Sequence, residues 1–271
     1  MRRSRQQTRP AMSARGTGDS ATLNRQVLDS LSQSFMQGDF VPGQKLTLRE
    51  LAGSLGTSMT PIREAISRFS ALGVVTVHPK RHIEVEPLTP ESYIELVEIR
   101  KLLEGHAAAQ AATRATSAEI DALAEINKRV LRLARAGKLR RAMRENQRFH
   151  FAVYRTARSR ALLEGIENLW LRVGPSLNKV LSESFSHDKR SLTEGFENHD
   201  VVIRALRARD ASSALLAMTA DIEVSASYLL TGLRHELPSP SETAAQIAGS
   251  SRLHRRRSTP RATERRTRPT G

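Results

Sequence analysis

The chain has 271 residues, of which 39% are hydrophobic and 4% aromatic, enough for a small domain and a larger one with cores built mainly of aliphatic side chains. It has no cysteine, which excludes disulfides and thiolate chemistry and fits a cytoplasmic protein, and no apolar run that approaches the roughly 20 residues of a membrane helix. The formal net charge of +15 does not by itself indicate a nucleic-acid binder, because most of it lies at the two ends.

Both ends of the chain are basic and are predicted to be disordered. Residues 1–20 hold five arginines and one aspartate and too few apolar residues to fold. No apolar segment follows them, so they do not form a secretory signal. Residues 236–271 are rich in serine, proline and arginine. Such arms attract phosphate without regard to sequence, or are simply solvated chain.

Residues 21–87 are predicted to form a small domain of three helices and a hairpin. Apolar positions at helical spacing indicate a first helix over residues 22–36, and a Pro-Gly turn at 42–43 follows it. Thr47 and Glu50 form a capping box that begins a second helix.

The third helix begins after Ser58 and is predicted to have one apolar and one polar side. Its apolar arc docks onto the two earlier helices, and its outer side carries Thr60, Arg63, Ser67 and Ser70. Residues 73–88 then read as two short strands around a tight turn.

Short hydrogen-bonding side chains and an arginine on an outer helix face suit a helix that enters a DNA major groove. Arg49 and the hairpin-tip pair Lys80 and Arg81 flank this face and suit phosphate contacts. The alternative is a helical domain whose charges merely face water. The combination of helix-turn-helix, hairpin and basic edges favours DNA binding.

Residues 88–235 are predicted to form an all-α antiparallel bundle of six helices. The first begins at Thr89-Pro90 and runs to about residue 112. A second capping box, Thr116 with Glu119, begins the next helix, which ends near residue 136. The remaining helices are expected at 138–158, 160–183, 190–208 and 210–233, the last of them capped by Asp210.

Three of these helices turn polar side chains toward an apolar interior. Asn146 and His150 lie one turn apart on one helix face, while His199 and Asp221 lie on the inward stripes of two later helices. Buried without partners, these groups would be costly, so they are expected to meet one another or a cation. Spacing alone favours a hydrogen-bonded network without metal.

The stretch "PGQKLTLRELAGSLGTSMTPIREAISRFSALGVV" resembles the winged helix-turn-helix of GntR-family bacterial transcription regulators. "IELVEIRKLLEGHAAAQAA" and "ENQRFHFAVY" are similar to the all-helical FCD effector domain of the FadR branch of that family. The resemblance covers about residues 21–233. Motif and resemblance together give the expected DNA-binding set, which is Arg49, Ser58, Met59, Thr60, Arg63, Ser67, Lys80 and Arg81.

Two positions depart from the family pattern. Met59 stands where the family usually has arginine, so one guanine-reading guanidinium is missing and the operator should differ at that base pair. His82 replaces a usual glycine in the wing, which alters the expected geometry of its tip.

The resemblance also implies a divalent metal ion, held by Asp or Asn and three histidines. Asn146, His150 and His199 match the first three positions, and Asp221 replaces the fourth histidine. The mixed nitrogen and oxygen set shifts preference toward Mn²⁺ or Mg²⁺, with Zn²⁺ or Ni²⁺ still open. Arg100 matches a cavity-facing arginine suited to an organic acid; alternatively it pairs with Glu104 on its own helix.

The expected function is a ligand-responsive, DNA-binding transcriptional regulator and not an enzyme. The resemblance implies a homodimer on a pseudo-palindromic operator, most often a repressor released by a small carboxylate. Two alternatives stay open: a metal-dependent enzyme acting on a small organic acid, and a sequence-indifferent nucleic-acid binder that works through its arginine-rich ends.

Overall fold

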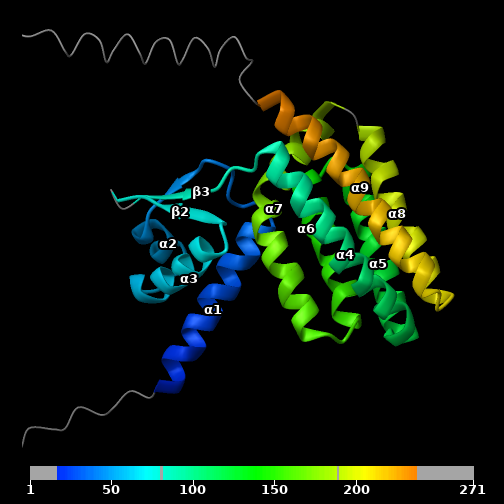
Figure 1. The fold of residues 1–271 in the computed structure, drawn as a ribbon, viewed down its shortest axis with the longest axis horizontal. Helices are drawn as coiled ribbons and strands as arrows, with labels where there is room; N and C mark the ends of the chain where they lie inside the picture. The colour runs from blue at the N-terminus through cyan, green and yellow to red at the C-terminus, as the bar shows by residue number, and fades with distance from the viewer. Residues whose placement is uncertain (1–16, 80–81, 188, 237–271) are drawn as a thin grey trace, which may run out of the picture.

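The computed structural model describes residues 17–79, 82–187 and 189–236. It is mainly α-helical, with a winged helical unit on one side and a helical bundle on the other (Figure 1). The predicted contacts of Lys80 and Arg81 and most of the predicted disordered ends lie outside the described residues. The first helix begins at Thr17 and the last ends at Glu236, so residues 17–20 and 236 are helical and not part of the predicted arms.

The N-terminal unit has the predicted helix-turn-helix and hairpin. Its elements are α1 (Thr17–Met36), β1 (Lys45–Leu46), α2 (Leu48–Ser54), α3 (Met59–Ala71), β2 (Val75–Val77) and β3 (Ile83–Val85). The three strands form an antiparallel sheet in the order β1-β3-β2. The sequence did not predict β1, because two residues are too few to show an alternating pattern.

Local signals explain where α2 and α3 begin. The Thr47–Glu50 capping box is formed in both directions. Gly56, between the two helices, has φ +61°, a conformation that glycine adopts without strain. Ser58 is the N-cap residue of α3, but its side chain makes no capping hydrogen bond.

The bundle consists of the six predicted helices. They are α4 (Pro90–Arg114), α5 (Ser117–Arg135), α6 (Leu139–Thr156), α7 (Arg160–His187), α8 (Lys189–Arg207) and α9 (Ala211–Glu236). Thr116 and Glu119 form the predicted capping box of α5, and Asp210 caps α9 by accepting from the Ser213 backbone N–H at 3.0 Å. α4 packs along α9, and α5 packs against α6 and α8.

The buried apolar side chains form two clusters, one in the bundle and one in the N-terminal unit. Leu171 lies on α7 of the bundle, but its side chain is buried in the N-terminal cluster. The two units therefore share packed side chains.

The sequence was expected to contain no segment long and apolar enough to span a membrane, and part of α9 does not meet that expectation. Within the described chain, Ala211–Leu233 is long and apolar enough to cross a membrane, with a mean hydropathy of 1.2. This is weak support for a span, because a core helix of a soluble protein passes the same test. α9 lies along α4 and buries Met218, Ile222 and Leu229 in the bundle core.

Candidate functional site

The outer face of α3 is exposed as the sequence predicts. Ile62, Ile66 and Phe69 are buried in the N-terminal core. The exposed positions on and beside α3 include the predicted residues Arg49, Ser58, Met59, Thr60, Arg63, Ser67 and Ser70. The Met59 side chain is 48% exposed, so it is not part of the core.

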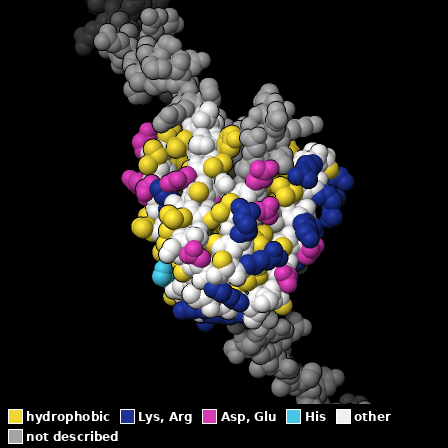
Figure 2. Space-filling view, turned by 90° about the vertical axis from the view of Figure 1, so that its right-hand side faces the viewer, with side chains coloured by type: hydrophobic (Ala, Val, Ile, Leu, Met, Phe, Trp, Pro, Cys, Tyr) yellow, Lys and Arg dark blue, Asp and Glu magenta, His cyan; other side chains and the backbone are white. Residues whose placement is uncertain are grey.

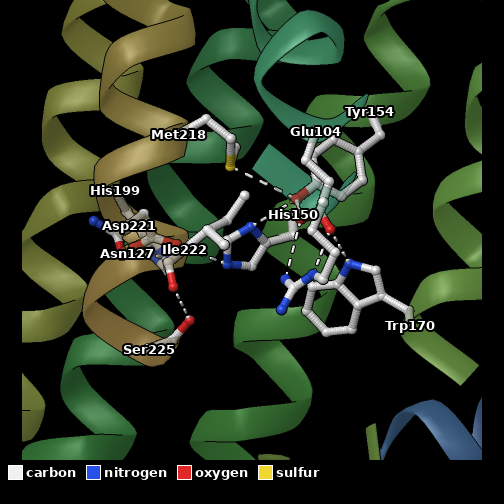
Figure 3. A network of polar contacts seen from close by, with 11 residues as sticks. Glu104, Asn127, His150, Tyr154, Trp170, His199, Met218, Asp221, Ile222 and Ser225 are labelled. Atoms are coloured by element: carbon white, nitrogen blue, oxygen red, sulfur yellow. Dashed lines mark hydrogen bonds and ion pairs between the residues drawn. The ribbon is translucent and has the colours of Figure 1, made fainter. Parts of the chain in front are cut away.

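In the bundle, α6, α8 and α9 bring His150, His199 and Asp221 together (Figure 3). His150 Nε2 lies 3.3 Å from Asp221 Oδ2, and His199 Nε2 lies 3.7 Å from Asp221 Oδ1. All three side chains are buried. Asn146, one turn before His150 on α6, is also buried.

Each histidine is oriented by a hydrogen bond at its other ring nitrogen. His150 Nδ1 lies 3.1 Å from the Tyr154 hydroxyl, and His199 Nδ1 lies 2.9 Å from Asn127 Oδ1. Asn127 in turn donates to Asp200 Oδ1 at 2.8 Å. Such outer contacts fix the ring orientation of histidine ligands in metal sites.

The hydrogen-bond network assigns the tautomers of both rings. The Tyr154 hydroxyl donates to Glu104, so its oxygen accepts from His150 Nδ1–H. The Asn127 amide nitrogen donates to Asp200, which identifies the other amide atom, Oδ1, as the acceptor for His199 Nδ1–H. Both Nε2 atoms then carry lone pairs, and they face a carboxylate that also only accepts. Three acceptors meeting in a buried space require a proton or a cation between them.

Burial dominates the electrostatics of this cluster. It lowers the pKa of His199 to about 3 and raises the pKa of Asp221 to about 7. Burial, then the neighbouring His199 and Arg100, hold the pKa of His150 well below its usual value. Without a cation the protein therefore favours uncharged imidazoles, the form that ligates metals.

The donor set fits a divalent metal ion. His199 Nε2 is fully buried and has no hydrogen-bond partner among the described residues. In a tetrahedral site with bonds of about 2.0–2.2 Å, ligand atoms lie about 3.3–3.6 Å apart. The two histidine–aspartate separations, 3.3 and 3.7 Å, are close to that spacing.

Next to His150, a buried ion pair joins Arg100 and Glu104 on α4. Arg100 Nε and Nη2 donate to the two carboxylate oxygens at 2.6 and 3.2 Å, and Trp170 Nε1 donates to Glu104 at 3.1 Å. The guanidinium lies 4.9 Å from the centroid of the Trp170 rings. Burial by itself would lower the pKa of Arg100, but the Glu104 carboxylate outweighs it and the pKa is raised.

Two donor atoms in this region have no partner within the described chain. They are Arg100 Nη1 and the hydroxyl of Tyr93, whose side chain is 0% exposed. Burial raises the pKa of Tyr93 to about 12, and the charge of Arg100 and a weak side-chain contact with it act in the opposite direction, so the guanidinium lies beside the Tyr93 oxygen. Such a contact uses the oxygen as an acceptor and leaves the Tyr93 O–H without an acceptor among the described residues. A buried donor without a partner is rare in proteins and points to an absent acceptor.

Sequence reasoning missed Asn127, Tyr154 and Trp170 as parts of this site. Trp170 is buried like a core residue, and it also forms one wall of the polar cluster. Tyr154 lies one turn after His150 on α6, a spacing that could have indicated the contact. No local signal marks Asn127, whose partner is 72 residues away.

α7 links the polar cluster to the N-terminal unit. Trp170 contacts Glu104, whereas the next residue, Leu171, is buried in the N-terminal core. One turn later, a Cβ built on Gly174 would lie 2.7 Å from both Met36 Cα and Phe35 O of α1. The absence of a side chain at Gly174 therefore permits the close packing of α7 on α1.

α6 makes a second link to the N-terminal unit. Its first turns carry Arg140 and Arg144, which donate to Asp39 Oδ1 at 2.7 and 2.8 Å, and its later turns carry His150. A cleft of ≈ 1130 Å³ opens between α1 and α3 on one side and α6 and α7 on the other. Its lining does not include the His150 cluster, so the cleft and the polar cluster are different features.

Comparisons with known proteins agree with both halves of the fold. The family "Bacterial regulatory proteins, gntR family" matches residues 23–85, and the FCD domain matches residues 95–224. The chain is 31% identical to the HTH-type transcriptional regulator McbR of Escherichia coli over 197 residues, 72% of this chain and 88% of McbR. It is 30% identical to the "Probable D-xylose utilization operon transcriptional repressor" of Paenarthrobacter nicotinovorans, over 73% of this chain and 84% of that protein.

The solved structure of E. coli McbR/YncC superimposes with a TM-score of 0.72 at 27% identity, covering 78% of this chain and 98% of that one. A second match, a transcriptional regulator from Rhodococcus sp. RHA1, has a TM-score of 0.61 at 20% identity and supports the fold alone. Nothing in these relatives supports the enzyme alternative. The chain belongs to the GntR family of bacterial regulatory proteins, with an FCD domain behind its winged helix-turn-helix, and is a DNA-binding transcriptional regulator.

Proposed function

We propose that this regulator is a cytoplasmic, homodimeric repressor whose affinity for a pseudo-palindromic operator is controlled by a small organic acid, bound beside a divalent metal ion in the bundle. The observation that supports it best is the convergence of His150 Nε2, His199 Nε2 and the Asp221 carboxylate in a buried space. The repressor assignment draws on the Paenarthrobacter relative, which is named as a probable repressor.

The DNA-reading surface in this proposal is the outer face of α3. Arg63 and Thr60 contact bases, Met59 offers only apolar contact, and Arg49 contacts phosphate from α2. Ser58 and Ser67 complete the α3 surface, and Lys80 and Arg81 extend it from the wing. The proposed DNA-binding domain spans residues 21–87, and the proposed effector and dimerisation domain spans residues 88–235.

The proposed metal ligands are His150, His199 and Asp221, with Asn146 as a weaker neutral ligand. Two imidazoles with oxygen ligands suit Zn²⁺ or Ni²⁺ as well as Mn²⁺ or Mg²⁺. A bound ion would supply a positive charge to which one carboxylate oxygen of the organic acid can bind. Asn127 and Tyr154 keep both Nε2 lone pairs directed at this point.

Arg100 is the proposed second anchor of the organic acid. Its Nε and Nη2 donate to Glu104, whereas Nη1 and the neighbouring Tyr93 hydroxyl make no hydrogen bond of good geometry within the described chain. A carboxylate oxygen can therefore bind Arg100 Nη1 without breaking the Arg100–Glu104 pair. The two roles considered for Arg100, ion pair and effector anchor, are compatible.

The effector is proposed to act on DNA binding through α6 and α7. Both helices contribute to the polar cluster and contact the N-terminal unit, through Asp39 and through Leu171 and Gly174. Movement of either helix on ligand binding would displace one α3 relative to the other in a dimer. Binding to paired half-sites depends on that spacing.

Exposed apolar side chains on the bundle support a homodimer. Leu102 on α4 is 72% exposed and Leu216 on α9 is 66% exposed. Figure 2 shows hydrophobic side chains gathered on one part of the bundle surface, with lysines and arginines mainly on another. Large apolar side chains exposed on neighbouring helices are typical of protein interaction sites.

The test of the metal and effector proposal is the double variant His150→Ala with His199→Ala. We expect elemental analysis to show loss of the divalent ion, and operator affinity to stop responding to a panel of carboxylates, while binding without effector is kept. The matched control, His106→Ala, removes an exposed α4 histidine outside the cluster. Unchanged metal content in the double variant would count against the site.

A further inference from the structure

The wing hairpin carries a second group of potential metal ligands, far from the bundle interior in the fold (Figure 1). His78 directly follows β2, His82 directly precedes β3, and Glu84 lies within β3. The His78 backbone N–H donates to the His82 carbonyl oxygen at 3.0 Å, so these two residues face each other across the hairpin.

The register of the hairpin places all three side chains on one face. Val77 pairs with Ile83 and Thr76 pairs with Glu84, so His78 is the next residue opposite His82. Side chains alternate between the two faces of a strand, and residues two apart therefore share a face. His82 and Glu84 are two apart, and His78 lies on their side.

The ligand atoms of the three side chains are already close. His78 Nε2 lies 3.1 Å and His82 Nε2 lies 4.0 Å from the same Glu84 oxygen, and one ligand atom from each residue lies within 4.8 Å of the others. The two rings stack with centroids 4.3 Å apart and planes 13° apart. A tetrahedral metal ion requires ligand atoms about 3.3–3.6 Å apart, so small side-chain rotations are enough.

The chemistry of the set indicates which ions it suits. Two imidazoles and one carboxylate, with further positions open to water, suit borderline transition metals such as Zn²⁺ rather than Mg²⁺ or Ca²⁺. The side chains are about one third exposed, at 36%, 31% and 30%, so an ion can reach them from solvent. Stacking and the cross-strand hydrogen bond hold the two rings side by side before any ion binds.

We propose that His78, His82 and Glu84 form a binding site for a divalent transition-metal ion of the Zn²⁺ class on the wing, separate from the bundle site. A bound ion would cross-link the two flanks of the hairpin and add positive charge to a segment that already contains Lys80 and Arg81. The site does not depend on the proposed metal and effector site of the bundle.

The test is a Zn²⁺ titration of the full-length, metal-free chain by calorimetry, compared with His78→Asn plus His82→Asn. We expect the wing variant to lose one equivalent of Zn²⁺, or to bind it at least tenfold more weakly. Glu84→Gln, which keeps the side-chain size, should weaken the same equivalent. The control His106→Asn makes the same change at an exposed histidine outside both groups and should have no effect.

The double variant His150→Ala with His199→Ala separates this proposal from the function proposed above. It should retain the equivalent of Zn²⁺ that the wing variant loses. Thermal unfolding of each metal-free variant checks that the fold is intact. Zn²⁺ binding with unchanged stoichiometry and affinity in the wing variant would overturn the proposal, as would loss of that equivalent in the bundle variant alone.

Discussion

At the scale of single residues, the DNA-reading assignment depends most on Arg63, which is exposed on α3, whereas its neighbours Ile62 and Ile66 are buried. Among the α3 residues proposed to contact DNA, which are Met59, Thr60, Arg63 and Ser67, Arg63 has the charged side chain. The surrounding residues offer short hydroxyls or the apolar Met59. Loss of Arg63 should therefore affect sequence recognition and leave the fold unchanged.

Arg63→Ala is expected to weaken binding to a specific operator by about 1–3 kcal/mol, the value of one good bidentate base contact. The measurement is a gel-shift titration against operator and random DNA. Arg132→Ala, which removes an exposed arginine on α5, is the matched control for the lost charge. Equal operator affinity in the two variants would contradict the assignment of the reading face.

Asn127 is the residue whose role in the cluster is most open to a direct test. It accepts from His199 Nδ1, so Asn127→Ala leaves this ring without an orienting partner. We expect metal affinity to fall about 10–100-fold, as for other outer contacts of metal ligands. Operator binding without effector should be kept.

Competition with a chromophoric chelator measures this affinity. Asn168→Ala, at a half-buried asparagine of α7 outside the polar cluster, is the comparison. If both variants bound metal as the wild type does, the positioning role of Asn127 would be refuted.

At the scale of elements, α7 is the helix that joins the two units. Consecutive residues on it, Trp170 and Leu171, face the polar cluster and the N-terminal core, respectively. The close approach to α1 at Gly174 leaves no room for a methyl group. The position of α7 is therefore coupled to the position of α1.

Gly174→Ala is expected to force α7 away from α1 at a cost of about 1–3 kcal/mol, typical of overpacking. Chemical denaturation measures the loss of stability, and operator titration with and without effector measures the coupling. Gly165→Ala on the same helix meets only Leu103 Cδ1 at 3.5 Å, an ordinary contact, so it should be neutral or stabilising. A Gly174→Ala protein as stable as the Gly165→Ala protein would show that the close approach is not required.

At the scale of the whole molecule, the charge distribution separates general attraction from sequence reading. Residues 1–16 hold five arginines and no acidic residue, and residues 237–271 hold eight arginines and two glutamates. These ends account for most of the net charge of +15, whereas the proposed reading face lies on α3.

A fragment of residues 17–236 is expected to keep its preference for operator over random DNA. A plot of the logarithm of its DNA affinity against the logarithm of salt concentration should have a smaller slope than that of the full chain, because fewer phosphate contacts release fewer counterions. Fluorescence anisotropy at several salt concentrations measures both quantities. A fragment without any operator preference would favour the sequence-indifferent alternative.

The sequence by itself determined the order and type of most elements. Periodic apolar positions, the capping pairs of Thr47 and Thr116, and the Asp210 cap are local signals, so they predicted the three N-terminal helices, the hairpin and the six bundle helices. The two-residue strand β1 was not predicted, because it is defined only by its pairing with β3. The inward positions of His150, His199 and Asp221 were also readable, since helical spacing fixes the side on which a residue lies.

Only the tertiary structure decided which polar groups meet. Packing of helices distant in sequence determines three contacts: that of Asn127 with His199, that of both histidines with Asp221, and that of Trp170 with Glu104. The same holds for the His78–His82–Glu84 group, in which hairpin register brings the rings together. Local sequence fixes which face of an element a side chain occupies, but distances between elements follow from packing the whole chain into one shape.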